Sequence, residues 1–203
     1  MVLLRPHVGA AAKLPIRGGC VLSRLLSKRP RRFAWPVALL IVAWALSFEV
    51  ASASAQPFPT DEVLERNVFA ELNVVRRAYG VAPLRRSGGL VVASRHHSIE
   101  MARYGYFGHQ SADGSSSDRR IARFYPRGTH RFWAVGENLL WATGDIDATE
   151  VLRRWLGSPQ HRKNMLTARW RDLGIGVVHV ATAPGAFGGS DVTLITADFG
   201  VRR

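Results

Sequence analysis

The chain has 203 residues, 47% hydrophobic and 21% charged, with 28 lysines and arginines against 15 acids. Eight of these cations and one acid precede residue 56, so residues 56–203 carry 20 cations and 14 acids, a net charge of about +6. A length of about 150 residues fits one domain with a real core and excludes two full domains. The single cysteine, Cys20, also precedes residue 56. Disulfides, a cysteine nucleophile and zinc–thiolate sites are therefore excluded from residues 56–203.

Residues 1–55 have the pattern of an export signal. A basic stretch ends at Arg32, sixteen uncharged residues follow at 33–48, and Ala53-Ser54-Ala55 fits an A-x-A cleavage site. Sixteen helical residues span about 24 Å, less than the roughly 30 Å hydrocarbon core, so a cleaved signal is favoured over an uncleaved membrane anchor. We therefore expect a secreted or periplasmic protein whose single domain occupies residues 56–203.

The net positive charge has two interpretations. Arginine pairs at 76–77, 85–86, 119–120 and 153–154 spread cations through the domain. They favour either a solvated basic surface, which is the simpler interpretation, or contact with anionic envelope polymers and lipid head groups. Export disfavours nucleic acid as a partner, and the chain has no nucleic-acid recognition motif.

Two amphipathic helices are predicted first along the domain. Thr60-Asp61-Glu62 resembles a helix start with a capping hydroxyl at Thr60, and an apolar stripe then runs to Gly80. A second stripe begins at Leu90 and ends at Gly105. His97 lies on the apolar face of this second helix and His96 points away, which predicts a hydrogen-bonded core histidine rather than a ligand at position 97.

The rest of the domain predicts short helices followed by a pair of strands. Residues 107–117 form a polar loop, Asp118 caps a short helix to Tyr125, and residues 133–141 form a strand-and-turn segment broken by Gly136. A helix over 148–157 follows, and His161 begins the next turn. Residues 174–180 and 192–199 are β-branched runs that predict an antiparallel hairpin. Helices first and paired strands late indicate an α+β fold, without βαβ alternation.

Periodicity also predicts which side chains form the core. The predicted core positions are Leu64, Val68, Leu72, Val75, Leu90, Ala93, Met101, Val151, Leu152, Trp155, Ile175, Val177, Leu194, Ile195 and Phe199. Trp133, Trp141 and Trp155 are expected in the core rather than on a sugar-stacking surface.

Three ionisable residues stand at turns, where a core does not need them: His109, Glu137 and His161. Imidazole and carboxylate are suitable ligands for zinc or another divalent ion, and three protein ligands leave a position for water. The same residues also suit a general base with its orienting partner, or side chains that bind loop backbone. A serine nucleophile is disfavoured because neither Ser98 nor Ser111 lies in a G-x-S-x-G elbow.

A run of motifs resembles the CAP superfamily of cysteine-rich secretory, antigen 5 and pathogenesis-related 1 proteins, also called the SCP domain, in its compact bacterial branch. The matching elements, in chain order, are Leu72-Asn73 with Arg76, Pro83-Leu84, Ala93 with His97-Ser98 and Met101-Ala102, Tyr106-Phe107-Gly108-His109, Asp113-Gly114-Ser115, Gly136-Glu137-Asn138-Leu139, Trp155 with residues 158–166 (SPQHRKNML), residues 174–177 (GIGV) and Phe199-Gly200. They cover nearly all of residues 56–203.

The resemblance implies an α-β-α sandwich, in which a small antiparallel sheet lies between helical layers and two histidines with acidic residues line a central groove. His109 and His161 match the groove histidines and Glu137 the acid, and in such family members the groove can hold zinc or another divalent cation. Many eukaryotic members have a second glutamate where this chain has Ser158. Asp147, Glu150 or water are the candidates to complete the set.

Function is less constrained, because a fold alone does not decide it. The leading hypothesis is a non-catalytic binding module, expected to be monomeric, that takes a small-molecule, lipid or envelope ligand and makes at most transient membrane contact. The alternative is a metal-assisted hydrolase of envelope or ester substrates, with Glu137 as the base. A third hypothesis is a structural envelope protein in which His109 and Glu137 only hold loops together.

Overall fold

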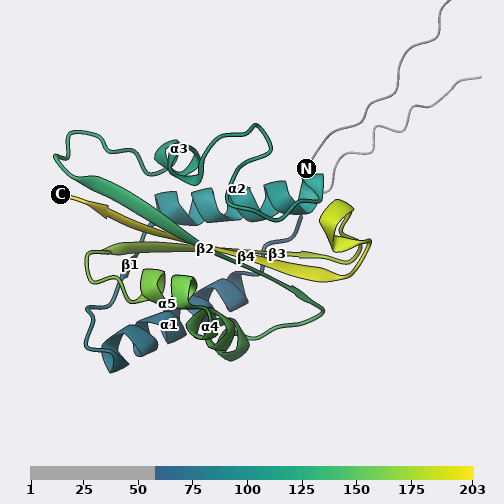
Figure 1. The fold of residues 1–203 in the computed structure, drawn as a ribbon, viewed down its shortest axis with the longest axis horizontal. Coiled ribbons are helices and arrows are strands. Elements are labelled where there is room, and N and C mark those ends of the chain that lie inside the picture. The colour runs from purple at the N-terminus through teal and green to yellow at the C-terminus, as the bar shows by residue number, and fades with distance from the viewer. Residues whose placement is uncertain (1–57) are drawn as a thin grey trace, which may run out of the picture. The chain divides into compact units, whose positions relative to one another are not determined.

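The computed structural model describes residues 58–203, and the predicted export signal lies outside them. In these residues one four-stranded sheet lies between two helical layers (Figure 1). The strands are β1 (Arg85–Arg86), β2 (Trp133–Thr143), β3 (Asp172–Val180) and β4 (Val192–Arg202), in the order β1-β3-β4-β2. Helices α2 (Gly88–Tyr104) and α3 (Ser117–Ala122) cover one face, and α1 (Glu62–Ala78), α4 (Ala148–Gly157) and α5 (Pro159–Met165) cover the other. The predicted α+β sandwich is confirmed.

The two long helices begin and end where the sequence signals place them, with one change of cap. The side chain of Asp61, not Thr60, accepts the backbone N–H of Leu64 at 2.9 Å and so caps α1. Thr60 instead forms an isolated antiparallel bridge with Val178. Gly105 takes a left-handed conformation after α2, where a side chain would be strained.

The predicted hairpin is confirmed: β3 and β4 pair antiparallel from Asp172 opposite Gly200 to Val180 opposite Val192. The 3-10 turn η1 (Gly185–Phe187) lies in the connection between them.

The break predicted at Gly136 is wrong, because β2 is an uninterrupted strand that pairs with β4 along its whole length. Gly136 is needed there for packing. A Cβ at this position would come within 2.9 Å of the side chains of Asn164 and Trp170.

Two local predictions also need correction. Ser116 is the N-cap residue of α3, so Asp118 lies inside the first turn, and the helix ends at Ala122 instead of reaching Tyr125. The sequence analysis also missed β1, which pairs parallel with β3 through Arg85 and Arg86. A two-residue strand shows no alternation of apolar and polar residues.

The core follows the predicted positions closely. All fifteen predicted core side chains are buried except Val75, which packs against the core while partly exposed. Trp155 is fully buried, and its indole N–H donates to the carbonyl of Leu139 at 3.1 Å. The simple picture of a solvated basic surface is wrong for Arg76 and Arg120, whose side chains are completely buried.

Helix α2 lies directly on the backbone of β3. A Cβ at Gly174 would stand 2.1 Å from the carbonyl carbon of Leu90, and one at Gly176 would stand 2.2 Å from the backbone nitrogen of Arg95. Such distances leave no room for any side chain. The two glycines therefore set how close α2, with its histidines, lies to the sheet.

Candidate functional site

The register of β2 and β4 places two carboxyl groups side by side on the face covered by α2 and α3. Glu137 of β2 lies directly opposite Asp198 of β4. The Glu137 side chain is only 2% exposed and Asp198 is fully buried. Two adjacent buried carboxylates are costly unless a cation or a proton neutralises them.

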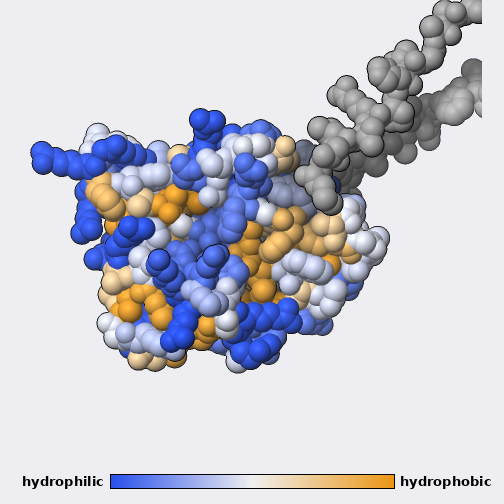
Figure 2. All heavy atoms as spheres, in the orientation of Figure 1, coloured by the Kyte–Doolittle hydropathy of each residue, from blue (hydrophilic) through white to orange (hydrophobic). Residues whose placement is uncertain are grey.

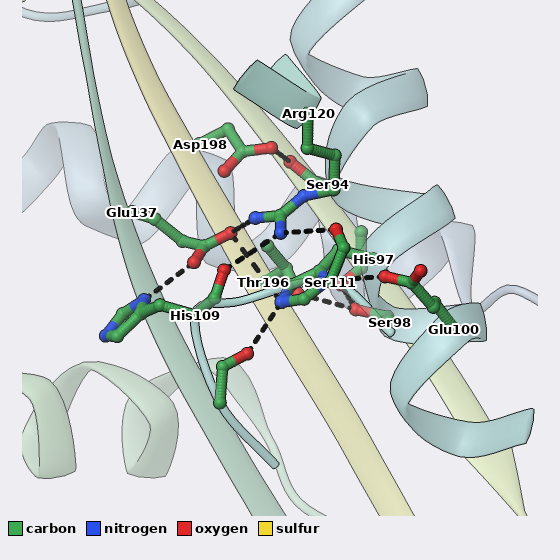
Figure 3. A network of polar contacts seen from close by, with 12 residues as sticks. Ser94, His97, Ser98, Glu100, His109, Ser111, Arg120, Glu137, Thr196 and Asp198 are labelled. Carbon is green, nitrogen blue, oxygen red and sulfur yellow. Dashed lines mark hydrogen bonds and ion pairs between the residues drawn. The ribbon is translucent and has the colours of Figure 1, made fainter. Parts of the chain in front are cut away.

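Arg120 of α3 supplies the cation. Its guanidinium forms an ion pair with Glu137 Oε2, and Nη1 donates to the carbonyl of His109 at 3.0 Å and to Ser111 Oγ at 3.2 Å (Figure 3). Arg120 thus joins the sheet to the polar loop that carries His109. Its Nε atom has no hydrogen-bond partner among residues 58–203.

The second carboxyl group, that of Asp198, is affected by burial in a different way. Burial and the nearby Glu137 carboxylate raise the pKa of Asp198 well above its ordinary value. Its Oδ2 atom lies 3.0 Å from the hydroxyl of Ser94 on α2. Burial therefore favours the protonated form of Asp198, and the Arg120 guanidinium pairs with the neighbouring Glu137.

His109 lies at the open edge of this network. Its Nδ1 atom is 2.6 Å from Glu137 Oε1, while 59% of its side chain is exposed. The hydrogen bond to Glu137 outweighs partial burial and raises the pKa of His109 above the ordinary 6.5. The structure therefore brings His109 and Glu137 together and turns the imidazole outward.

His97 is the buried histidine that its place on the apolar face of α2 predicts. Its Nε2 lies 2.9 Å from the carbonyl of Gly108 and its Nδ1 lies 3.3 Å from Glu100 Oε2. Burial lowers the pKa of His97. Since Gly108 precedes His109, this contact also fixes the loop in place.

His161 approaches from the opposite layer. Side chains alternate along β2, so Glu137 and Asn138 point to opposite faces of the sheet. The Asn138 amide donates to the carbonyl of His161 at 3.1 Å and its oxygen accepts from Asn164 at 3.0 Å, which holds α5 against β2. Burial and the charge of His109 both lower the pKa of His161. Glu137 and Asn138, neighbours on β2, thus hold His109 on one face of the sheet and the backbone of His161 on the other.

This geometry does not fit a three-ligand divalent site. Among residues 58–203 no group of three histidine, cysteine, aspartate or glutamate side chains is arranged to hold a metal ion. Both Glu137 oxygens already have partners, Arg120 and His109. A metal also needs a neutral imidazole, and the Glu137 contact favours protonated His109. Metal binding by His109, Glu137 and His161 stays a prediction.

The residues considered for the missing second glutamate have other roles. The Asp147 carboxylate caps α4 by accepting the N–H of Glu150 at 2.8 Å. Glu150 itself pairs with Arg153 and Arg154. The acids that accompany His97 and Glu137 are instead Glu100 and Asp198.

Sequence reasoning missed Arg120 and Asp198. Asp198 left one usable signal, because it is a charged residue in the middle of a strand that is otherwise charged only at its last position, Arg202. Arg120 left none, since arginine beside Arg119 in a short polar helix is typical of a surface.

Comparison with known proteins decides the family. Residues 69–187, more than half of the chain, match the model of the CAP family, described as the cysteine-rich secretory protein family. The chain belongs to this family.

The relatives of this CAP domain extend beyond it. The chain is 31% identical to the uncharacterized protein YkwD and 32% identical to the uncharacterized membrane protein YlbC, both from Bacillus subtilis (strain 168). Each match covers 114 residues and 56% of this chain, but 42% of YkwD and 31% of YlbC. This chain thus spans less than half the length of both relatives.

A solved structure shows the same fold. An extracellular protein containing a SCP domain from Bacillus anthracis str. Ames matches with a TM-score of 0.53 and 23% identity, over 70% of this chain and 41% of that one. Within residues 58–203 of the CAP domain, no helix is both long enough and apolar enough to cross a membrane.

The pKa values of His109 and His161 in the CAP domain should be shifted in opposite directions. In NMR titrations with a chelator present, we expect the pKa of His109 above 6.5 and that of His161 below it. A raised folded-state pKa means that protonated His109 stabilises the fold below the unfolded pKa, and that this contribution is lost as pH rises through the folded value. Glu137→Gln should return the His109 pKa toward 6.5. A His109 pKa below that of His161 would contradict the described contact.

Proposed function

We propose that this CAP domain is an exported binding module without catalysis of its own, and that it receives a ligand on the surface around His109 and His161. The observation that carries the proposal is the fixed state of Glu137. Both its oxygens are engaged beneath an outward-facing imidazole. Because this buried network holds Glu137 through both carboxylate oxygens, it presents His109 as a recognition group with little freedom to move.

The hydrolase alternative has less support from this geometry. A general base must reach the proton that it takes, and Glu137 is 2% exposed and paired with a buried arginine. The neighbouring serine hydroxyls are also engaged: Ser98 lies 3.1 Å from the carbonyl of Gly176, and Ser111 accepts from Arg120. Catalysis by Glu137 would require this buried ion pair to open, whereas binding of a ligand at His109 would not.

The proposed ligand class rests on the described locations of similar proteins and on the protonation of His109. The B. anthracis SCP-domain protein is described as extracellular, while YlbC is described as a membrane protein, and both descriptions favour a role at the cell envelope. The hydrogen bond to Glu137 raises the pKa of His109 and so favours its protonated form. We therefore propose an envelope or lipid component with an acidic or hydrogen-bond-accepting group as the ligand.

The test compares binding profiles of variants made in the residue 56–203 protein. Soluble peptidoglycan fragments and phospholipid vesicles are titrated against wild type, His109→Ala/His161→Ala and His179→Ala, a partly exposed histidine paired with Asp191 elsewhere. We expect wild type and His179→Ala to bind the same ligand and the double variant to lose it. Equal profiles for all three proteins would refute the proposal.

Calorimetry with zinc tests the metal separately. Micromolar binding that is lost in both His109→Ala and His161→Ala would place the two imidazoles on one ion and reopen metal-assisted hydrolysis. Failure of wild type to bind zinc would leave a metal-free binding module. A Glu137→Ala variant that loses thermal stability but keeps every ligand would favour the structural hypothesis.

A further inference from the structure

One end of the sheet collects most of the unbalanced positive charge of the domain. The first residues of β1, β2 and β3 and the last of β4 meet there, as the pairings Arg85–Asp172 and Trp133–Arg202 show. Four sequence-distant segments bring exposed arginines to this end, namely Arg85, Arg86, Arg127, Arg131, Arg169, Arg171, Arg202 and Arg203. Asp172 is the single acid in these segments.

The rest of the domain is close to neutral. Without these eight arginines and Asp172, residues 56–203 carry 12 cations and 13 acids. The net charge of the domain is thus concentrated on one end instead of being spread over a solvated surface. In Figure 2 hydrophilic residues project from the side of the molecule where Figure 1 places β1 and the C-terminus.

A cleft of about 470 Å³ lies within this cationic end. It is lined by Arg85, Arg86, Ser87, His130, Asp172 and Arg202. A recess of this size holds a phosphate group together with part of the chain that carries it.

Two of the cleft arginines are held in place. Arg85 donates to Asp172 Oδ1 at 3.0 Å. The Arg202 guanidinium stacks 4.1 Å above the Tyr125 ring and donates to the carbonyl of Pro126 at 3.2 Å. Tyr125 in turn donates its hydroxyl to Asp172 Oδ2 at 2.7 Å. These contacts orient two guanidinium groups around one recess, which lowers the entropic cost of binding a ligand.

Asp172 balances only one of the three arginine charges that line the cleft, that of Arg85. Both its oxygens accept hydrogen bonds, and its side chain is 12% exposed. Arg86 makes no ion pair with any residue of the described chain. The cleft therefore offers guanidinium donors in excess, and guanidinium matches the paired oxygens of a phosphate group.

We propose that this cationic end binds the phosphate groups of an anionic polymer, with the cleft as its central subsite. A polymer fits better than a membrane surface, because membrane adsorption also needs buried apolar area. The large exposed apolar side chain in the segments of this end is Phe132, and the Arg203 guanidinium lies over its ring. The repeated phosphate groups of a polymer could contact arginines from all four segments at once.

This site is separate from the His109 surface. Arg202 follows Asp198 by four residues on β4, so the two lie on the same face about 13 Å apart. Loss of one site need not affect the other, so the proposal stands independently of the function proposed for His109 and His161.

The test uses linear polyphosphate as a soluble phosphate polymer, titrated against the residue 56–203 protein at several salt concentrations. We expect Arg86→Gln/Arg202→Gln to weaken binding about tenfold or more at low salt and to reduce the salt slope by about two, by analogy with phosphates of nucleic acids. Arg153→Gln/Arg154→Gln removes the same charge from α4 and should bind nearly as wild type. The single variant Arg86→Gln, at an exposed position, is titrated as well, so that weaker binding can be distinguished from loss of folding.

Other outcomes decide against the proposal. Equal weakening by both double variants would show attraction to net charge without a site. Binding to phosphatidylglycerol vesicles but not to polyphosphate would assign this end to membranes, and no binding at low salt would remove the site. Unchanged polyphosphate binding by His109→Ala/His161→Ala is expected, and its loss would merge the two sites into one.

Discussion

Replacing Arg120 with methionine is expected to lower the free energy of unfolding by about 3–5 kcal/mol, because it strands a buried carboxylate. Glu137 would lose its ion pair while its side chain remains 2% exposed, and Asp198 beside it would offer no positive charge. The carbonyl of His109 and the hydroxyl of Ser111 would also lose their donor. Urea denaturation of wild type and variant, at the same pH, measures the loss.

Two further variants separate the ion pair from simple loss of volume. Arg123→Met, at the C-cap residue that follows α3, breaks a half-exposed pair with Asp113 and should cost less than about 1 kcal/mol. Adding Glu137→Gln to Arg120→Met should recover part of the stability, because the stranded charge is removed. If the double variant is as unstable as the sum of both single variants, Arg120 and Glu137 do not act as a pair.

Gly176→Ala should destabilise the domain by about 1–3 kcal/mol, as overpacking in a tight interface does. The new Cβ would stand 2.2 Å from the backbone nitrogen of Arg95, so α2 would have to move away from β3. That movement would stretch the contact between the Ser98 hydroxyl and the carbonyl of Gly176, now 3.1 Å. Thermal unfolding followed by circular dichroism gives the change in stability.

The matched control is Gly157→Ala at the end of α4. A Cβ there would meet nothing within 4 Å and the backbone needs no left-handed conformation, so stability should be equal or slightly higher. A Gly176→Ala protein as stable as this control would mean that α2 adjusts freely on the sheet.

Much of the fold could be predicted because local signals and burial agreed. The apolar stripe of α1 contains Leu64, Val68 and Leu72, all buried, and the β-branched runs became the β3–β4 hairpin. These elements can be predicted from hydrophobic periodicity, which is visible in a single sequence. The family motifs also placed His109 near Glu137, which the structure shows at hydrogen-bond distance.

The electrostatic centre of the site could not be predicted, because it depends on pairing across the sheet. Asp198 becomes a partner of Glu137 only through the register of β2 and β4, 61 residues apart in the chain. Arg120 is buried because the loop and α3 fold over that pair, and nothing in its neighbours marks this. The histidines are visible as motifs, whereas the charge that fixes them is a property of tertiary structure.

The bridge between Thr60 and Val178 fixes where the described chain enters the domain. Thr60 lies beside Val178 near the end of β3, whereas the arginine-rich end begins at Asp172, about 20 Å away along the same strand. The described chain thus begins near one end of the sheet and presents these arginines at the other. A fluorescent label attached at Phe58 would therefore sense events at the end of the sheet opposite the arginine-rich cleft.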